Sequence, residues 1–206
     1  STIFDNFEEK RFEGENEAYI CSLIRHDEVE EFVAYVNKNN FYLSSDIEPS
    51  IFETNSFLNK HKSTLIEYAA FFGSIQIFQY LQINKVKLEP SLWLYAIHGR
   101  NADLIHHLET NDVPLPKGGY EKCFSESIKC HHNELASYFE NNLLINENDE
   151  TNNKIVSSIF HHFNYSNFPT EVNGKYEKYA FFYMCLYNYS KLVELFLSIK
   201  EEFIKE

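Results

Sequence analysis

The chain has 206 residues, 44% of them hydrophobic and 17% aromatic, and a formal net charge of −13 at pH 7. This hydrophobic content is enough for a sizeable core, and the small numbers of glycine and proline argue against extended disorder. The acidic balance opposes binding to nucleic acid or to an anionic membrane surface, because both usually require basic patches. It fits a basic protein partner and plain solubility equally well.

The four cysteines, Cys21, Cys123, Cys130 and Cys185, are scattered and do not resemble a disulfide framework. This usage favours a reducing compartment. No apolar run is long enough to span a membrane, and no signal peptide is visible. We therefore expect a cytoplasmic (intracellular) protein, monomeric and without a membrane segment.

The N-terminal half begins with two irregular stretches around one weak helical hairpin. Residues 1–17 are acidic and weakly patterned, which fits either a small apolar lid over the first hairpin or a frayed terminus. Residues 18–36 have apolar residues at helical spacing on both sides of Asp27, and predict the first hairpin. Residues 37–62 are too long for a simple connection, and their apolar residues predict a packed insertion.

The clearest helical hairpin spans residues 63–83. Thr64 can begin its first helix as a side-chain cap, and Ala69-Ala70 leaves one face without bulk, so that another helix can approach closely. Gly73 tolerates the left-handed backbone of a tight turn, and an apolar stripe marks the second helix. A hairpin this short cannot bury its apolar face alone, which predicts stacked copies of itself.

Later copies of this hairpin are expected near residues 91–109, 119–141 and 177–200. Alignment on the turn places Asp27, Arg100 and Asn188 at the position of Gly73, and Asn also tolerates a left-handed backbone. The stretch 141–175 is irregular, with one further helix expected near 153–163. The sequence thus predicts an all-α chain of about five degenerate hairpins with two insertions.

The hairpin pattern resembles a known repeat. Residues 64–73 resemble an ankyrin repeat, although Leu65 and Glu67 stand where that repeat usually has Pro and His. Residues 65–81, 90–99 and 126–132 together resemble the divergent ankyrin-type domain of unknown function of parasitic protists, over roughly residues 18–200. The resemblance implies an ankyrin-like solenoid over residues 18–206, followed by regular ankyrin repeats in the full-length chain.

By the same resemblance, the chain is expected to be a non-enzymatic scaffold that binds protein partners, basic ones among the candidates, through the concave face of the stack. The two residues before each turn belong to this face, which gives Arg25, His26, Phe71, Phe72, His98, Lys129, Leu186 and Tyr187 as candidates. Two adjacent Phe cannot both point into one groove. One of them is therefore an exposed binding residue, unless the insertion at 44–60 folds over it.

The alternative is a metal-binding or Cys/His-dependent hydrolytic domain built from Cys123, Cys130, His131 and His98. The two cysteines lie two helical turns apart on one face. A zinc site, however, needs four convergent ligands, and adjacent histidines on a helix point about 100° apart. No catalytic motif and no phosphate-binding glycine pattern surrounds these residues. Core cysteines, no cofactor and no enzymatic activity are therefore expected.

Overall fold

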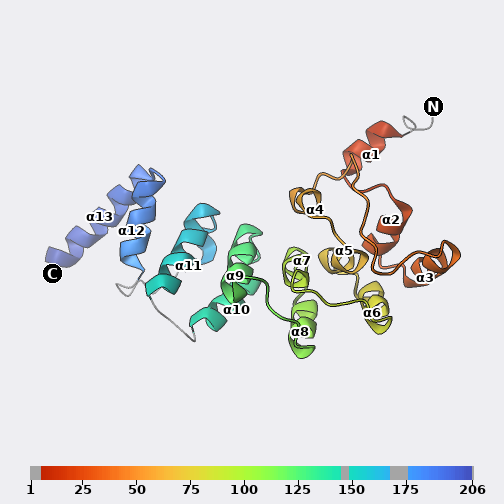
Figure 1. The fold of residues 1–206 in the computed structure, drawn as a ribbon. Helices are drawn as coiled ribbons and strands as arrows, with labels where there is room; N and C mark the ends of the chain where they lie inside the picture. The colour runs from red at the N-terminus through yellow and green to blue at the C-terminus, as the bar shows by residue number, and fades with distance from the viewer. Residues whose placement is uncertain (1–5, 145–148, 168–175, 206) are drawn as a thin grey trace. The chain divides into compact units, whose positions relative to one another are not determined.

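The computed structural model of the chain describes residues 6–144, 149–167 and 176–205 (Figure 1). These residues form α-helices and one short 3-10 helix, η1 (Tyr165–Asn167), with no β-strand among them. Their sole β pairing is an isolated antiparallel bridge between Asp46 and Thr64. This confirms the all-α class, and no described helix has the length and apolar character needed to cross a bilayer.

The chain divides into two compact units, Ser1–Pro114 and Leu115–Glu206, where the sequence predicts one repeat domain. Unit 1 contains three helical hairpins: α2 (Tyr19–Arg25) with α3 (Val29–Lys38), α5 (Leu65–Phe72) with α6 (Ile75–Ile83), and α7 (Leu92–His98) with α8 (Ala102–Thr110). The first helices pack side by side in the order α2, α5, α7.

The first two hairpins of unit 1 are neighbours although residues 37–62 separate them in sequence. The carboxylate of Asp27, in the α2–α3 turn, accepts hydrogen bonds from the backbone N–H groups of Gln76 (3.0 Å) and Ile77 (2.9 Å). These are free donors at the N-terminus of α6, which an Asp side chain satisfies well. The insertion therefore loops out of the stack and does not interrupt it.

The N-terminal helix α1 (Phe7–Glu13) contacts this insertion. The ring of Phe7 lies edge-on to Phe52 at 5.3 Å, and the backbone N–H of Thr54 donates to the carbonyl of Gly14. Phe12, one of the apolar residues that a lid in this segment would use, is 94% exposed. Ile3 and Phe4, the other apolar residues of this segment, lie outside the described residues.

Unit 2 contains two hairpins and one further helix between them. The hairpins are α9 (Gly119–Lys129) with α10 (Asn133–Leu144), and α12 (Glu177–Leu186) with α13 (Ser190–Lys205). The intervening α11 (Asp149–His161) packs on both α9 and α12, through buried residues that include Val156 and Phe160. It begins before the expected residue 153, because acidic side chains in its first turn suit the positive end of a helix.

All five hairpins use the same turn. The backbone is left-handed at Gly73, which directly follows its helix, and at the residues two positions past the other four helix ends, Asp27, Arg100, His131 and Asn188, with φ of 70°, 54°, 51°, 56° and 59°. In each turn the next backbone N–H donates to the carbonyl five residues earlier, as from Ser74 to Ala69 at 2.9 Å. This is the Schellman pattern, which closes the exposed carbonyls of a helix end.

Candidate functional site

The first pair of candidate binding residues, Arg25 and His26, divides between two roles. The Arg25 side chain is 11% exposed, and its Nε lies 2.8 Å from a Glu15 carboxylate oxygen. Its Nη1 also donates to the carbonyl of Asn16 (2.9 Å) and to the hydroxyl of Tyr68 (3.1 Å). Arg25 therefore fastens the N-terminal segment to α2 and α5, whereas His26 is exposed.

The insertion contacts Phe71, one member of the pair Phe71 and Phe72. Phe57, on the short helix α4 (Ser56–Lys60), is buried and stacks on Phe71 with ring centroids 6.0 Å apart and planes at 14°. It also lies 3.9 Å from the ring of His98, which is half-buried. Phe72 is half-buried against Phe71 at 5.0 Å. The structure thus joins these three candidates in one aromatic cluster with Phe57 of the insertion.

Two of the three candidate binding residues in unit 2 make contacts within the chain itself. The Lys129 ammonium lies 2.5 Å from a carboxylate oxygen of Glu126, a side chain that is only 5% exposed. A buried carboxylate needs such a partner, so Lys129 compensates for it. Tyr187 stacks on Tyr183 at 6.1 Å within an aromatic cluster. Leu186, by contrast, is 58% exposed.

Leu186 belongs to an exposed apolar side of α12 that the sequence analysis did not single out. Phe182 (55% exposed), Cys185 (exposed) and Leu186 lie at positions i, i+3 and i+4, which places them on one face. The opposite side of α12 packs on α11 through Ala180 and Tyr183. We call Phe182, Cys185 and Leu186 the outer face of α12. Their helical spacing was the signal available in the sequence.

The equivalent face of α5 is covered by the next hairpin. Alignment on the turns gives its members as Glu67, Ala70 and Phe71. Glu67 accepts a hydrogen bond from Ser91 (2.5 Å), and Phe71 stacks on His98 (5.5 Å). A Cβ placed on Gly99 would lie 2.6 Å from the Ala70 carbonyl oxygen. All three contacts are made to residues in or next to α7. The outer face of α12 is therefore equivalent to the face through which α5 packs on α7.

The cysteines of the alternative, metal-binding or hydrolytic interpretation are poorly suited to form thiolates. Burial raises the pKa of Cys123 to about 12 and that of Cys130 to about 11. Both thiols are therefore protonated near neutral pH, and a metal ligand or nucleophile would have to lose its proton against this burial. His131 is exposed at its turn, and His98 stacks on Phe57 in unit 1.

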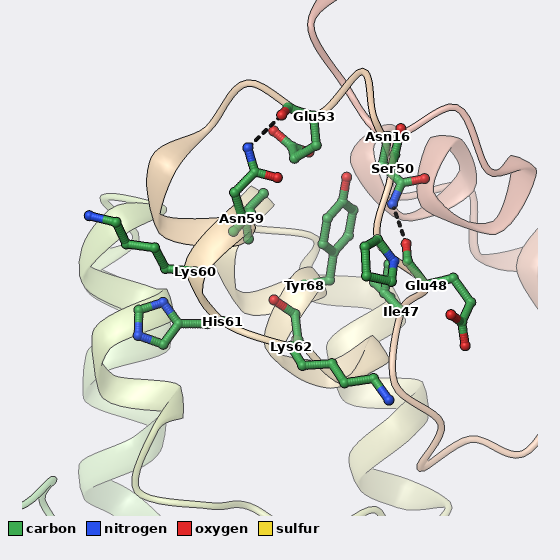
Figure 2. Close-up of a pocket in the computed structure, with 13 residues that line it drawn as sticks. Asn16, Ile47, Glu48, Ser50, Glu53, Asn59, Lys60, His61, Lys62 and Tyr68 are labelled. Carbon is green, nitrogen blue, oxygen red and sulfur yellow. Dashed lines mark hydrogen bonds between the residues drawn. The ribbon is translucent and has the colours of Figure 1, made fainter.

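A pocket of about 270 Å³ lies in unit 1 beneath the insertion (Figure 2). Its walls come from the loop at 47–53, from the end of α4 and the residues after it (58–63), and from Asn16, and Tyr68 of α5 projects between them. The pairing of Asp46 with Thr64 closes these segments into one compact loop.

No protein-family model, curated protein or solved structure matches the chain. The resemblance to the ankyrin-type domain therefore stays a prediction from the sequence, and the feature on which a function can be argued is the outer face of α12.

Proposed function

We propose that the chain is a protein–protein interaction module and that the outer face of α12 binds another helical hairpin. The observation that carries the proposal is the contrast between α5 and α12, which share a turn and an alignment. On α5 the face of Glu67, Ala70 and Phe71 contacts the following hairpin, whereas on α12 two large apolar side chains on this face are more than half exposed. A contiguous exposed apolar face typically marks an interaction site.

The shape of this face fits a closely packed helix. Cys185 stands where α5 has Ala70, and both are small side chains that allow a second backbone to approach. Phe182 and Leu186 flank it and supply apolar area for the contact. A partner hairpin with basic residues around an apolar centre would also complement the net charge of −13.

The remaining expectations from the sequence belong to this proposal. The Schellman turn that recurs in both units, and the side-by-side first helices of unit 1, support ankyrin-like stacking of the hairpins. By the resemblance, the hairpin that covers α12 is the first of the ankyrin repeats that follow in the full-length chain. The module itself would then be a cytoplasmic, monomeric and non-enzymatic scaffold without a cofactor, and the concave face would bind further protein partners.

Thiol labelling tests whether the outer face of α12 is covered in the natural protein. Cys185 is exposed, whereas Cys21 and Cys123 are buried and serve as internal references. We expect N-ethylmaleimide to label Cys185 readily in the isolated 206-residue chain. In the full-length protein from its natural source, labelling should be at least about tenfold slower, the effect of a contact worth about 1.4 kcal/mol. Equal labelling rates in the two samples would contradict the proposal.

A pair of charge substitutions sharpens this test. Leu186→Lys in the full-length protein should restore rapid labelling of Cys185, because a lysine charge opposes burial in an apolar contact. The matched control is Ile83→Lys, which changes a more exposed apolar residue (79%, against 58% for Leu186) at the end of α6. Restoration by both substitutions would indicate general destabilisation and not a contact at α12.

A further inference from the structure

In unit 1, α6 contacts the next hairpin through a polar side chain. The Gln82 side chain accepts a hydrogen bond from Nε2 of His107 (2.7 Å) and donates one to Oδ1 of Asn111 (3.1 Å). His107 lies on α8, and Asn111 directly follows that helix. One turn before Gln82, the ring of Phe78 lies edge-on to His107 at 5.8 Å. Phe78 and Gln82 therefore mark the side of α6 that contacts the following hairpin.

The equivalent positions on α13 are both apolar. Alignment on the turns places Val193 at the position of Phe78 and Leu197 at the position of Gln82. Val193 is half-buried, and Leu197 is 47% exposed. The side chain of Leu197 has neither donor nor acceptor, so it cannot make the two hydrogen bonds that Gln82 makes.

The first helices differ in the same way. The carboxylate of Glu67 on α5 accepts a hydrogen bond from the hydroxyl of Ser91, the residue before α7. Its equivalent on α12 is Phe182, a member of the outer face. On both helices, a residue that makes polar contact with the next hairpin in unit 1 is therefore replaced in unit 2 by a large, exposed apolar residue.

The opposite side of α6 shows which apolar residue of α13 does not belong to this surface. The ring of Tyr80 lies edge-on to Phe32 of α3, in the preceding hairpin, at 6.0 Å. The equivalent of Tyr80 is Leu195, which is 55% exposed. Leu195 and Leu197 are two residues apart, so they do not share a face of the helix. Leu195 is thus a control residue of the same type and similar exposure.

We propose that α12 and α13 together bind a helical hairpin of a partner whose residues at the positions of Ser91, His107 and Asn111 are apolar. This inference rests on the proposed function, because it specifies the partner of the outer face of α12. The template is the interface between the second and third hairpins of unit 1, in which both helices of one hairpin contact the next.

The same chemistry excludes a partner hairpin that resembles α7–α8. The polar groups at the positions of Ser91, His107 and Asn111 would be buried against Phe182 and Leu197 without hydrogen-bond partners, which disfavours the contact. Specificity of this kind arises as much from the penalty against the wrong partner as from contacts with the right one. The surface is therefore selective for an apolar hairpin.

Two fusions test the chemistry of the partner. Each carries a copy of residues 84–114, which contain no cysteine, joined after Ser198, the residue equivalent to Ile83 at the end of α6. One copy is unchanged, and the other carries Ser91→Ala, His107→Leu and Asn111→Leu. Labelling of Cys185 by N-ethylmaleimide, measured by peptide mass spectrometry, should be at least about tenfold slower with the apolar copy than with the unchanged one. Equal labelling in the two fusions would overturn the proposal.

A reciprocal exchange identifies the residues that select the partner. Phe182→Glu with Leu197→Gln gives the surface the polar residues of α5 and α6. Both residues are exposed, so the exchange should leave the fold intact. The unchanged copy should now protect Cys185 about tenfold better than the apolar copy does. A preference that still favours the apolar copy would overturn the roles of Phe182 and Leu197.

The full-length protein separates this inference from the proposed function. There, Leu197→Gln should speed labelling of Cys185 about tenfold, whereas the matched control Leu195→Gln should change it less than about twofold. Rapid labelling of the wild-type full-length protein would overturn both proposals. Slow labelling that Leu197→Gln leaves unchanged would overturn this inference alone. Slow labelling of the 206-residue chain as a dimer would make a second copy the occupant, and would also overturn it.

Discussion

α5 and α12 are the first helices of hairpins that share a turn, yet their environments differ. The Cβ of Ala70 on α5 is fully buried, and the adjacent Gly99 approaches its carbonyl so closely that no side chain would fit between them. The equivalent Cys185 on α12 is exposed. The hairpin turn therefore does not depend on a neighbouring hairpin packed against the first helix. The turn after α12 has the same backbone as the turn after α5, although the outer face of α12 is exposed.

The two helices also begin differently. Thr64 and Glu67 form a reciprocal capping box at the N-terminus of α5. The residue before α12, Tyr176, makes no side-chain cap and is instead buried with Val156 and Phe160 in the core of unit 2. α5 is therefore stabilised by local bonds and by neighbours on two sides, whereas α12 depends on packing against α11 and α13.

The largest difference in stability is expected between two phenylalanine-to-alanine variants, one at the residue that covers α5 and one on the outer face of α12. Phe57→Ala deletes the buried ring that covers Phe71 and His98, and should lower the free energy of unfolding of unit 1 by about 3–5 kcal/mol. Phe182→Ala removes an exposed ring and should change stability by less than about 0.5 kcal/mol. Urea denaturation followed by circular dichroism measures both. Similar losses in the two variants would show that the α12 face is already packed.

The second comparison enlarges the small residue on each face. Ala70→Val adds two methyl groups where the side chain is completely buried, and should destabilise the chain by about 1–3 kcal/mol. Cys185→Val makes a similar change on an exposed surface and should stay within about 0.5 kcal/mol. The same urea titration decides the outcome, and a loss above about 1 kcal/mol for Cys185→Val would contradict an open α12 face.

A smaller effect is expected at the helix N-termini. Thr64→Ala removes the hydroxyl that caps α5 and should cost about 1 kcal/mol in thermal or urea unfolding. Ser56→Ala, at the exposed start of α4, is the control and should be nearly neutral, because Asn55 and not Ser56 caps that helix. If both serine and threonine variants lose the same stability, the capping box is not the source of the effect.

The sequence was informative where local chemistry repeats. The spacing of small and apolar residues around Gly73 predicts an all-α chain, and the residues aligned with Gly73 all have a left-handed backbone. Gly99 lies directly against the backbone carbonyl of Ala70, in keeping with the expected close approach of a second helix. These features depend on neighbouring residues and on one repeating unit, so periodicity reveals them.

The candidate site was harder to read, because its contacts join residues distant in sequence. The repeat alignment places Arg25 on a binding face. In the structure its side chain instead forms an ion pair with Glu15 and a hydrogen bond to Tyr68. Phe71 becomes covered only because Phe57, in a non-repeating insertion, stacks on it. No repeat position predicts either contact.

The smallest expected effect distinguishes the units by their response to acid. Burial lowers the pKa of His162 in unit 2, with further lowering by His161, Lys129 and His131 and partial compensation by Glu126. The unfolded chain titrates this histidine near its ordinary value of about 6.5, so it binds a proton more readily than the folded chain does. Stability is therefore fully present above that value and falls as the pH drops through it toward the lowered folded pKa.

Urea midpoints of the wild-type chain should consequently decrease between about pH 7.5 and about pH 5.5, and His162→Gln should reduce that decrease, because its amide does not titrate in this range. His106→Gln alters an 82% exposed histidine of unit 1 and should leave the pH dependence unchanged. A flat profile in the wild type, or one altered equally by both substitutions, would show that burial of His162 does not set the response. The expected pattern instead locates the acid-sensitive packing at the end of α11, beside the hairpin whose outer face is open, and not in the enclosed stack around α5.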